Sequence, residues 1–390
     1  MSLLSANPVD DRTPVIVAAL RTPLCRTGGA LAGLTADELL APVLSGLLES
    51  SRLDGSAVDE VLAGNAVAAG GNVARQAALA AGLPASVAAL TLDRQCTSGL
   101  DAVIHAARLI QAGAGDVYLA GGTESISTAP QRAERLPDGS TRPYSRARFT
   151  PRGAADPEMG AAAENVAAHC GITREAQDAF AARSHERAVQ AVESGTFSAE
   201  TIPMPGAPRA HDDGPRATLD TRLLSRFRPV FRDGGTVTAG NSCQDVDGAA
   251  AVLLTTRARA RALGFTSGLL FEQAASAGVE PELLGLGAVA AARKLPDEVL
   301  SRPGLVEFNE AFAAQTLACL EGLGIDPATA NRDGGALALG HAYGASGAVL
   351  VVRLFHQARR LGVDGHSALA LISGAGGQGV AASFRWSASL

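Results

Sequence analysis

Ala88-Ala89-Leu90-Thr91-Leu92-Asp93-Arg94-Gln95-Cys96-Thr97-Ser98-Gly99-Leu100 joins an apolar, strand-like run to the start of an amphipathic helix. A thiol at this junction faces the free N–H groups and the positive dipole end of the helix. Both are expected to favour the thiolate, the reactive form of cysteine. Small residues follow Cys96, so a bulky substrate could approach it. Cys96 is therefore a candidate nucleophile, although free cysteine is also among the most buried residue types.

The pattern around Cys96 recurs near the C-terminus, which predicts an internally duplicated α/β fold. After Ser98-Gly99 an apolar helix runs to a stop at Gly113, and a buried strand with a glycine-rich end follows. After Ser346-Gly347 the same order of helix, glycine stop at Gly362, buried strand and glycine run returns. Helical spacing and short apolar runs indicate helices that cover a sheet. Two such halves facing each other would bring their loops to one shared cleft.

The composition indicates a globular, reduced protein of two or three domain-sized units. The chain has 390 residues, of which 47% are hydrophobic and 18% charged, with a net charge of −6. This balance argues against disorder and against nucleic-acid binding. No stretch is apolar enough to cross a membrane, and we expect no signal peptide, because the N-terminus has neither a basic n-region nor an apolar h-region. The five cysteines are scattered and form no C-x-x-C pair, so we expect no metal site, no disulfide framework and a cytoplasmic location.

A region of different composition, rich in Pro, Arg and Gly, separates the two halves. Its spacing predicts one helix from about Glu158 to His169 and a second that begins after the N-cap residue Thr173 and ends near Gly195. Guanidinium groups suit phosphates, so the arginines beside these helices could bind a phosphorylated ligand or an acidic carrier protein. A solvated surface is the alternative. These arginines are Arg132, Arg135, Arg142, Arg146, Arg148, Arg152, Arg209, Arg216, Arg222, Arg226, Arg228 and Arg232.

Three further motifs place polar side chains after strands or among glycines. Asn309 and Glu310 follow an apolar run and precede a helix, a typical position for functional side chains, although Asn309 could be only a helix cap. His341 lies in the glycine-dense loop Gly334–Gly347, where backbone and ligand can approach closely, so it is a candidate base. Gly374–Gly379 matches G-x-G-x-x-G, but too little chain follows for a βαβ unit. We expect instead a turn that directs backbone N–H groups at an oxyanion.

Together these motifs resemble the thiolase family, the thioester-dependent Claisen enzymes that make or cleave 3-ketoacyl-CoA. The resemblance runs from about Pro14 to Phe384 and includes Gly121–Ser125, Met159–Ala167 and Thr236–Asn241. It implies an α/β, thiolase-like fold in which two duplicated halves form a layered helix-sheet-helix-sheet-helix core with an inserted loop domain. The expected units are the N-terminal half over residues 1–128, the loop domain over 129–237, a return to the first half over 238–270, and the C-terminal half over 271–390.

The resemblance also implies the partners and the roles of the site residues. The substrates would be acyl-CoA or an acyl carrier protein, with coenzyme A as substrate or product and no permanently bound cofactor or metal. The protein would be a homodimer or a dimer of dimers. Cys96 resembles the nucleophile that takes the acyl group, and His341 the base that activates it. Asn309 resembles the residue that holds a water in the first oxyanion hole, to which His341 also donates a hydrogen bond. The N–H groups of Cys96 and Ala375 match those of the second oxyanion hole.

The chain departs from the family pattern beside these residues. The second catalytic cysteine of the family, in C-x-G-G-G, corresponds to Ser373, whose hydroxyl is a far poorer base than a thiol with a pKa of about 8.5. The family's G-H-P-x-G reads Gly340–Gly344 with alanine after the histidine. In the segment that contacts pantetheine, Cys243 replaces a serine and Gln244 a glycine. The family's H-M-G triplet has glutamate before Met159. Candidate substrate-binding residues are Met159, Arg216, Cys243 and Gln244.

Three functions are compatible with these residues. We favour a thiolase-type acyltransferase that forms an acyl-thioester on Cys96 and passes it to an acceptor, with altered or lost Claisen and thiolysis chemistry because of Ser373. The first alternative is an ordinary acetyl-CoA acetyltransferase or 3-ketoacyl-CoA thiolase whose second base comes from His341 or a water. The second is a non-catalytic subunit that binds acyl-CoA or scaffolds a multi-enzyme complex. Cys243 could also replace the missing thiol if its side chain points into the cleft.

Overall fold

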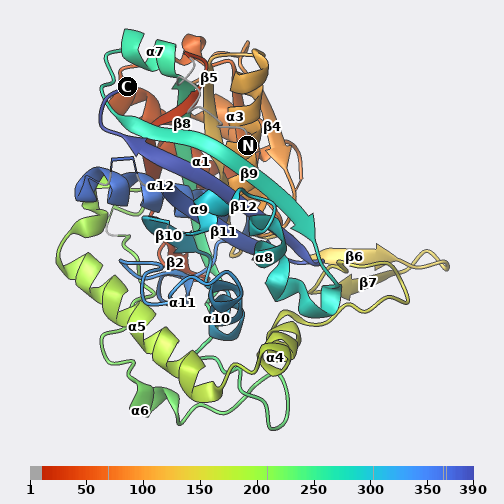
Figure 1. Cartoon of the computed structure of the whole chain (residues 1–390). Helices are drawn as coiled ribbons and strands as arrows, with labels where there is room; N and C mark the ends of the chain where they lie inside the picture. Colours follow the sequence, from red (N-terminus) through yellow and green to blue (C-terminus); the bar gives the residue numbers. More distant parts are fainter. Residues whose placement is uncertain (1–10, 69, 209, 302, 363, 366) are drawn as a thin grey trace.

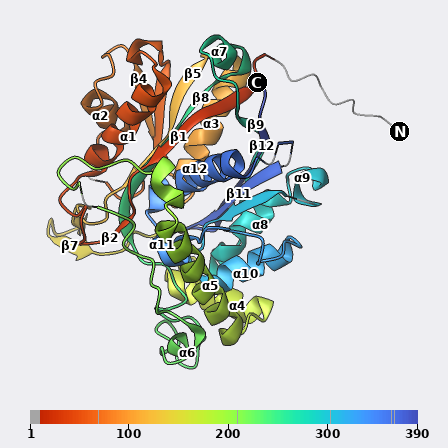
Figure 2. The same cartoon turned by 90° about the vertical axis from the view of Figure 1, so that its left-hand side faces the viewer.

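The chain folds into two similar α/β halves and a long inserted segment (Figures 1 and 2). This computed structural model describes residues 11–68, 70–208, 210–301, 303–362, 364–365 and 367–390. The N-terminal half contains β1 (Pro14–Arg21), β2 (Cys25–Arg26), α1 (Ala36–Ser51), η1 (Gly55–Ala57), β3 (Glu60–Gly64), α2 (Val73–Ala80), β4 (Ala88–Leu92), α3 (Ser98–Ala112), β5 (Val117–Glu124), β8 (Val246–Thr256) and α7 (Arg257–Ala262). The C-terminal half contains β9 (Gly268–Gly278), η3 (Pro281–Leu286), α8 (Gly287–Ala292), α9 (Asp297–Ser301), β10 (Leu305–Phe308), α10 (Ala313–Gly322), α11 (Ala336–Leu339), α12 (Tyr343–Leu361), β11 (Ser367–Gly374) and β12 (Gln378–Ser387).

The strands of both halves form one sheet. Among the described residues its order is β10-β11-β12-β9-β1-β8-β5-β3-β4, and β2 pairs with β8 outside this path. β3 pairs in parallel with β4 and β5, and β10 pairs in parallel with β11, whereas β8, β9 and β12 pair antiparallel with their neighbours. The halves meet where β1 pairs with β9, through only Val15 with Leu270 and Ile16 with Leu269. They are therefore nearly separate sheets that share a short edge.

Three hydrophobic clusters arrange these elements in five layers. The largest lies between the two half-sheets and contains the buried faces of α3 and α12, including Leu100, Ile104, Val351 and Leu354. A second cluster packs α1 and α2 on the outer face of the N-terminal half-sheet. A third packs α8 and α10 on the outer face of the other half-sheet. The order helix, sheet, helix, sheet, helix confirms the fold predicted from the sequence, with α3 and α12 as its central layer.

Glycines let α3 and α12 approach closely at their N-terminal ends. A Cβ atom on Gly99 would lie 2.5 Å from the carbonyl oxygen of Gly344 and 2.9 Å from the amide nitrogen of Ala348. A Cβ atom on Gly347 would lie 2.4 Å from the amide nitrogen of Leu100. Contacts this short exclude any side chain larger than hydrogen. Because each helix follows one of the candidate catalytic loops, this contact brings the two loops together.

Replacing Gly99 with alanine is therefore expected to destabilise the fold by about 1–3 kcal/mol, the range for an overpacked core. The added methyl group must push α3 away from the backbone of α12. Chemical denaturation of wild type and variant gives the difference in the free energy of unfolding. Gly33 is the matched control, because no atom lies within 4 Å of a Cβ placed there. Equal stability of the Gly99→Ala and Gly33→Ala variants would contradict the close approach.

The inserted segment contributes the hairpin of β6 (Arg132–Arg135) and β7 (Thr141–Tyr144), helices α4 (Met159–Cys170), α5 (Arg174–Glu193) and α6 (Thr221–Leu224), and η2 (Thr196–Ala199). In Figure 1 this hairpin projects away from the two α/β halves, and α4, α5 and α6 cover one end of these halves. The Thr173 hydroxyl accepts the N–H of Ala176 at 3.2 Å, as the predicted N-cap requires. Both helices predicted in this region are confirmed.

Candidate active site

Cys96 lies in the turn between β4 and α3, next to a residue with an unusual backbone conformation. Gln95, the residue before it, has a φ of +52°, and its N–H donates to the Asp93 carboxylate at 2.8 Å. A left-handed conformation costs a non-glycine residue about 1–3 kcal/mol, so the surrounding structure fixes this turn. The Cys96 thiol is free and half-buried. The N–H groups of Ala375 and of Cys96 itself lie toward it as hydrogen-bond donors.

The expectation that the helix end keeps Cys96 as a thiolate is wrong for the resting protein. Burial raises the pKa of Cys96 to about 12, and the negative charges of Glu124 and Asp245 act in the same direction. The N–H groups of Ala375 and Cys96 lower this pKa, but by less than burial raises it. Desolvation of the charged form therefore exceeds the effect of these two N–H groups. At neutral pH Cys96 is a thiol, and its attack on a thioester needs a base that removes the proton.

His341 is buried in the loop before α12. One of its ring nitrogens has a hydrogen-bond partner, and the other has none among the described residues. Its backbone N–H donates to the carbonyl of Gln244 at 2.8 Å, and its Nδ1 lies 2.6 Å from the Ser346 hydroxyl. Nε2 is buried and has no hydrogen-bond partner among the described residues. Burial lowers the pKa of His341 to about 4, so the ring is neutral at pH 7. A neutral imidazole with a free nitrogen can accept a proton.

Asn309 and Glu310 follow β10, as predicted, and they have different surroundings. The Asn309 amide nitrogen lies 3.5 Å from His341 Nδ1, so the structure brings these two side chains together. Glu310 instead accepts hydrogen bonds from the Ser184 hydroxyl and the Asn331 amide, each at 2.6 Å. Burial raises the pKa of Glu310, and these donors oppose that effect. Glu310 therefore fixes the loop that carries Asn309.

Ser373, at the place of the family's second cysteine, is tied into the packing of the C-terminal half. Its hydroxyl donates to the carbonyl of Gly285 at 2.7 Å and accepts the N–H of Ala288 at 3.0 Å. Neither partner belongs to the turn that carries the nucleophile candidate. The β11 residue that abuts that turn is Gly374, where a Cβ would lie 3.0 Å from Thr97 Cγ2. To act as a base, the Ser373 hydroxyl would first have to lose the proton that it donates to Gly285.

Cys243 and Gln244 lie close to this centre. The Cys243 thiol is half-buried, and Cys96, when ionised, raises the pKa of Cys243. Burial is the largest cause of that increase, so Cys243 is also a thiol at neutral pH. Tyr343 donates its hydroxyl to Asp245 at 2.8 Å, and its ring stands edge-on to that of His341 with 5.3 Å between the centroids. Two departures from the family pattern, Cys243 and Gln244, therefore lie near the candidate catalytic side chains.

The remaining predicted substrate-binding residues lie in the inserted segment. Met159 is half-buried at the start of α4. Arg216 is exposed, and its backbone N–H donates to His185 Nδ1 at 3.2 Å. Several other arginines of this region are paired within it: Arg142 and Arg152 with Glu134, Arg146 with Asp156 and Glu158, and Arg232 with Asn165. Arg209 lies outside the described residues.

Glu124, at the end of β5, is a site residue that the sequence analysis did not select. Its carboxylate is buried and accepts the N–H groups of Ala66, Val67 and Gly344 at 2.9, 3.1 and 3.0 Å. Burial raises its pKa to about 7, although these N–H groups oppose the shift. Because it holds the first turn of α12 against the N-terminal half, it fixes the loop that contains His341. Its only signal was its place in Gly121–Ser125.

Comparison with known proteins identifies the family. The model of the thiolase N-terminal domain matches residues 14–258, and that of the thiolase C-terminal domain matches residues 269–385. The chain belongs to the thiolase family. A Staphylococcus aureus (strain MRSA252) protein with the provisional name acetyl-CoA C-acetyltransferase VraB is 43% identical over 383 residues, 95% of this chain and 98% of that protein. An acetyl-CoA acetyltransferase of Pseudomonas aeruginosa is 43% identical over 385 residues, 94% and 98% of the two chains.

A solved thiolase has the same fold. The crystal structure of the Bacillus anthracis acetyl-CoA acetyltransferase superimposes with a TM-score of 0.89 at 36% identity, covering 96% of this chain and 99% of that one. The protein is therefore an acyltransferase of the thiolase type. Within the described residues, no helix combines the length and the apolar character needed to span a membrane. Nor does that part of the chain group three or more histidine, cysteine, aspartate or glutamate side chains suited to a metal ion.

Proposed function

We propose that this thiolase forms an acyl-thioester on Cys96 from an acyl-CoA or carrier-protein donor and transfers the acyl group to an acceptor. The combination of a protonated Cys96 thiol with a neutral His341 supports acyl loading. The Nε2 atom of His341 has no hydrogen-bond partner among the described residues, so it can accept the proton. The proton passes from Sγ to Nε2 as sulfur attacks the thioester carbonyl. The C–S bond of the donor then breaks, and Nε2 returns that proton to the departing sulfur, so the donor leaves as its thiol. The N–H groups of Cys96 and Ala375 would then stabilise the oxyanion.

The second half of the reaction would differ from that of an ordinary thiolase. Claisen condensation and thiolysis need a group that moves the α-proton of the second acyl-CoA, and Ser373 stands where the family has a cysteine. The serine hydroxyl is intrinsically a weak base, and its hydrogen bonds to Gly285 and Ala288 hold it in place. We infer that acyl loading survives while thiolysis of acetoacetyl-CoA is very slow. Measuring both rates on one preparation tests this, and thiolysis at the rate of a standard thiolase would contradict it.

The ordinary thiolase remains the first alternative, and the names of the relatives fit it equally well. His341 could act in both half-reactions, because its open Nε2 can take up and return a proton. A Cys243 thiol beside Cys96 could also supply the missing group. Full turnover by a Cys243→Ala variant would exclude the latter. Retention of Cys96, Asn309 and His341 argues against a non-catalytic subunit, which needs none of them.

Coenzyme A is the proposed substrate or product, with no resident cofactor and a cytoplasmic location. A homodimer, alone or paired into a tetramer, is the proposed assembly. Among the described strands, β4 is an edge of the large sheet, and its Leu90 is 45% exposed. An open strand edge with an exposed leucine is suited to pairing with a second copy of the chain.

A further inference from the structure

A small cavity lies behind the candidate catalytic residues, on the side away from the open nitrogen of His341. Its walls include Glu307, Asn309, Ser346 and Arg353. The centres of water molecules have about 20 Å³ of space in it. About 10–15 Å³ of such space is enough for one water, provided that two or more polar groups bind it. The cavity is therefore the size of one ordered water.

The polar groups on its walls are suited to that water. Ser346, whose hydroxyl already contacts His341 Nδ1 at 2.6 Å, lines the cavity. The Nε atom of Arg353 is buried and has no hydrogen-bond partner among the described residues. It lies 3.7 Å from Glu307 Oε2, too far for a direct hydrogen bond. A buried donor without a partner is costly, and a water between these groups would satisfy it.

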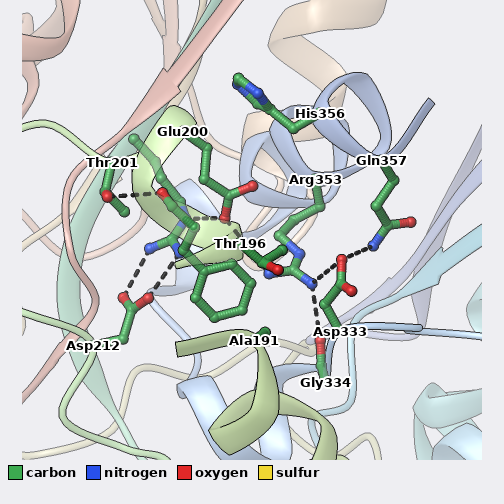
Figure 3. Close-up of polar contacts among 12 residues, drawn as sticks. Ala191, Thr196, Glu200, Thr201, Asp212, Asp333, Gly334, Arg353, His356 and Gln357 are labelled. Carbon is green, nitrogen blue, oxygen red and sulfur yellow. Dashed lines mark hydrogen bonds and ion pairs between the residues drawn. The ribbon is translucent and has the colours of Figure 1, made fainter. Parts of the chain in front are cut away.

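Arg353 is held rigidly by a buried cluster of charges, shown in Figure 3. Its guanidinium stands 4.5 Å from the centroid of the Phe197 ring, and Nη1 lies 3.5 Å from the carboxylate of Glu200. Nη2 donates to the carbonyl of Gly334 at 3.4 Å and lies 3.6 Å from Asp333. These contacts hold the guanidinium group in one orientation, and its Nε–H is the donor that remains without a partner among the described residues. Arg353 lines the cavity, so its Nε–H is a pre-organised donor available to a water there.

We propose that one buried water in this cavity connects Ser346 to Glu307 and Arg353, which makes Glu307 and Arg353 positioning residues for the base His341. The proposal rests on the proposed role of His341 in activating Cys96. It assigns a function to Glu307 and Arg353, two buried residues that line the cavity.

The chain of donors explains how a buried imidazole can take a proton. When the S–H bond of Cys96 breaks and an N–H bond forms at Nε2, His341 becomes a cation. Its Nδ1–H then donates to the Ser346 hydroxyl, that hydroxyl donates to the water, and the water donates to the Glu307 carboxylate. Arg353 Nε–H donates to the same water and orients it. A carboxylate at the end of such a chain stabilises the imidazolium.

The charge on Glu307 makes this effect depend on pH. Burial raises the pKa of Glu307 to about 8; the positive charge of Arg353 opposes this, and Asp333 and Glu310 add to it. Arg187, on α5, is a further cation that interacts with Glu307. Glu307 is therefore largely protonated below pH 8 and ionised above it. The histidine becomes a better base as Glu307 loses its proton, so the acylation rate should show a step near pH 8.

The test compares Glu307→Gln with Glu200→Gln across pH 6 to 9, following acyl-enzyme formation by intact-protein mass over time. Both variants neutralise a buried glutamate within reach of Arg353, but only Glu307 lines the cavity. We expect the acylation rate of Glu307→Gln to show no step near pH 8 and to be about tenfold lower than that of the wild type at pH 9. A tenfold change corresponds to about one pKa unit on the base His341. Glu200→Gln should keep the step.

Ser346→Ala interrupts the same series of hydrogen bonds at its other end. It provides the test of the proposal if Glu307→Gln does not fold. It should also lose the step, and the double variant should be no slower than the slower single variant, because both changes remove one pathway. A step near pH 8 that persists in Glu307→Gln or Ser346→Ala would overturn the inference while leaving the acyl-enzyme intact. A wild-type protein that forms no acyl-enzyme would overturn the proposed function and this inference together.

Discussion

Replacing His341 with asparagine is expected to slow acylation of Cys96 by about 10²–10⁴-fold, the usual contribution of a general base. The reason lies in the resting state of the nucleophile. Because burial raises the pKa of Cys96 to about 12, almost none of it is thiolate at pH 7. The reaction therefore depends on proton transfer to the neutral ring of His341. Asparagine can still bond to Ser346 but cannot accept that proton.

The rate of appearance of the acylated protein by mass spectrometry measures this loss. His185 provides a matched control, since burial also lowers its pKa to about 4 but its Nδ1 accepts the backbone N–H of Arg216. A His185→Asn variant should acylate at close to the wild-type rate. If His341→Asn acylated as fast as wild type, the thiol would have to be activated in some other way.

Replacing Ser373 with cysteine is expected to raise the rate of acetoacetyl-CoA thiolysis by about 10²-fold or more, the contribution expected of a restored acid–base group. A thiol has a pKa of about 8.5 and forms weaker hydrogen bonds than a hydroxyl. It is therefore held less firmly by Gly285 and Ala288, the partners of the serine, and can move a proton at neutral pH. Acyl loading on Cys96 should change little.

Thiolysis is followed by the loss of acetoacetyl-CoA in the presence of coenzyme A. Ser383→Cys is the control, because Ser383 is a buried serine of β12 in the same half-sheet. Its substitution adds a thiol without placing one at the candidate position. An unchanged rate in Ser373→Cys, together with substantial wild-type thiolysis, would favour the ordinary thiolase.

The local parts of the fold could be predicted from the sequence because each is decided by neighbouring residues. The α5 helix begins after Thr173, whose hydroxyl accepts the N–H of Ala176, so residues three apart set that boundary. Glycine stops at Gly113 and Gly362 end α3 and α12 in the left-handed conformation. The likeness of these two units predicted two α/β halves with a shared cleft, and the resemblance to the thiolase family implied the layered architecture. The short pairing of β1 with β9, which joins the half-sheets, left no pattern that could be recognised in either strand.

The electrostatics of the site could not be predicted, because they depend on contacts between distant residues. The helix end suggested a thiolate at Cys96, but the burial that raises its pKa comes from the packing of both halves. Glu307 looked like part of an apolar run before Asn309. Its charge partner Arg353 lies on α12, far along the chain, and the cavity between them exists only in the folded molecule.

The most direct test of the account is the mass of the intact protein after mixing with acetyl-CoA and a panel of longer acyl-CoAs, with Cys96→Ala as control. We predict a mass increase equal to the acyl group in the wild type and none in the variant. The donor that reacts fastest would identify the preferred acyl chain. An equal increase in Cys96→Ala would contradict the assignment of Cys96 as the nucleophile. The absence of any adduct from every donor would contradict acyl transfer from coenzyme A.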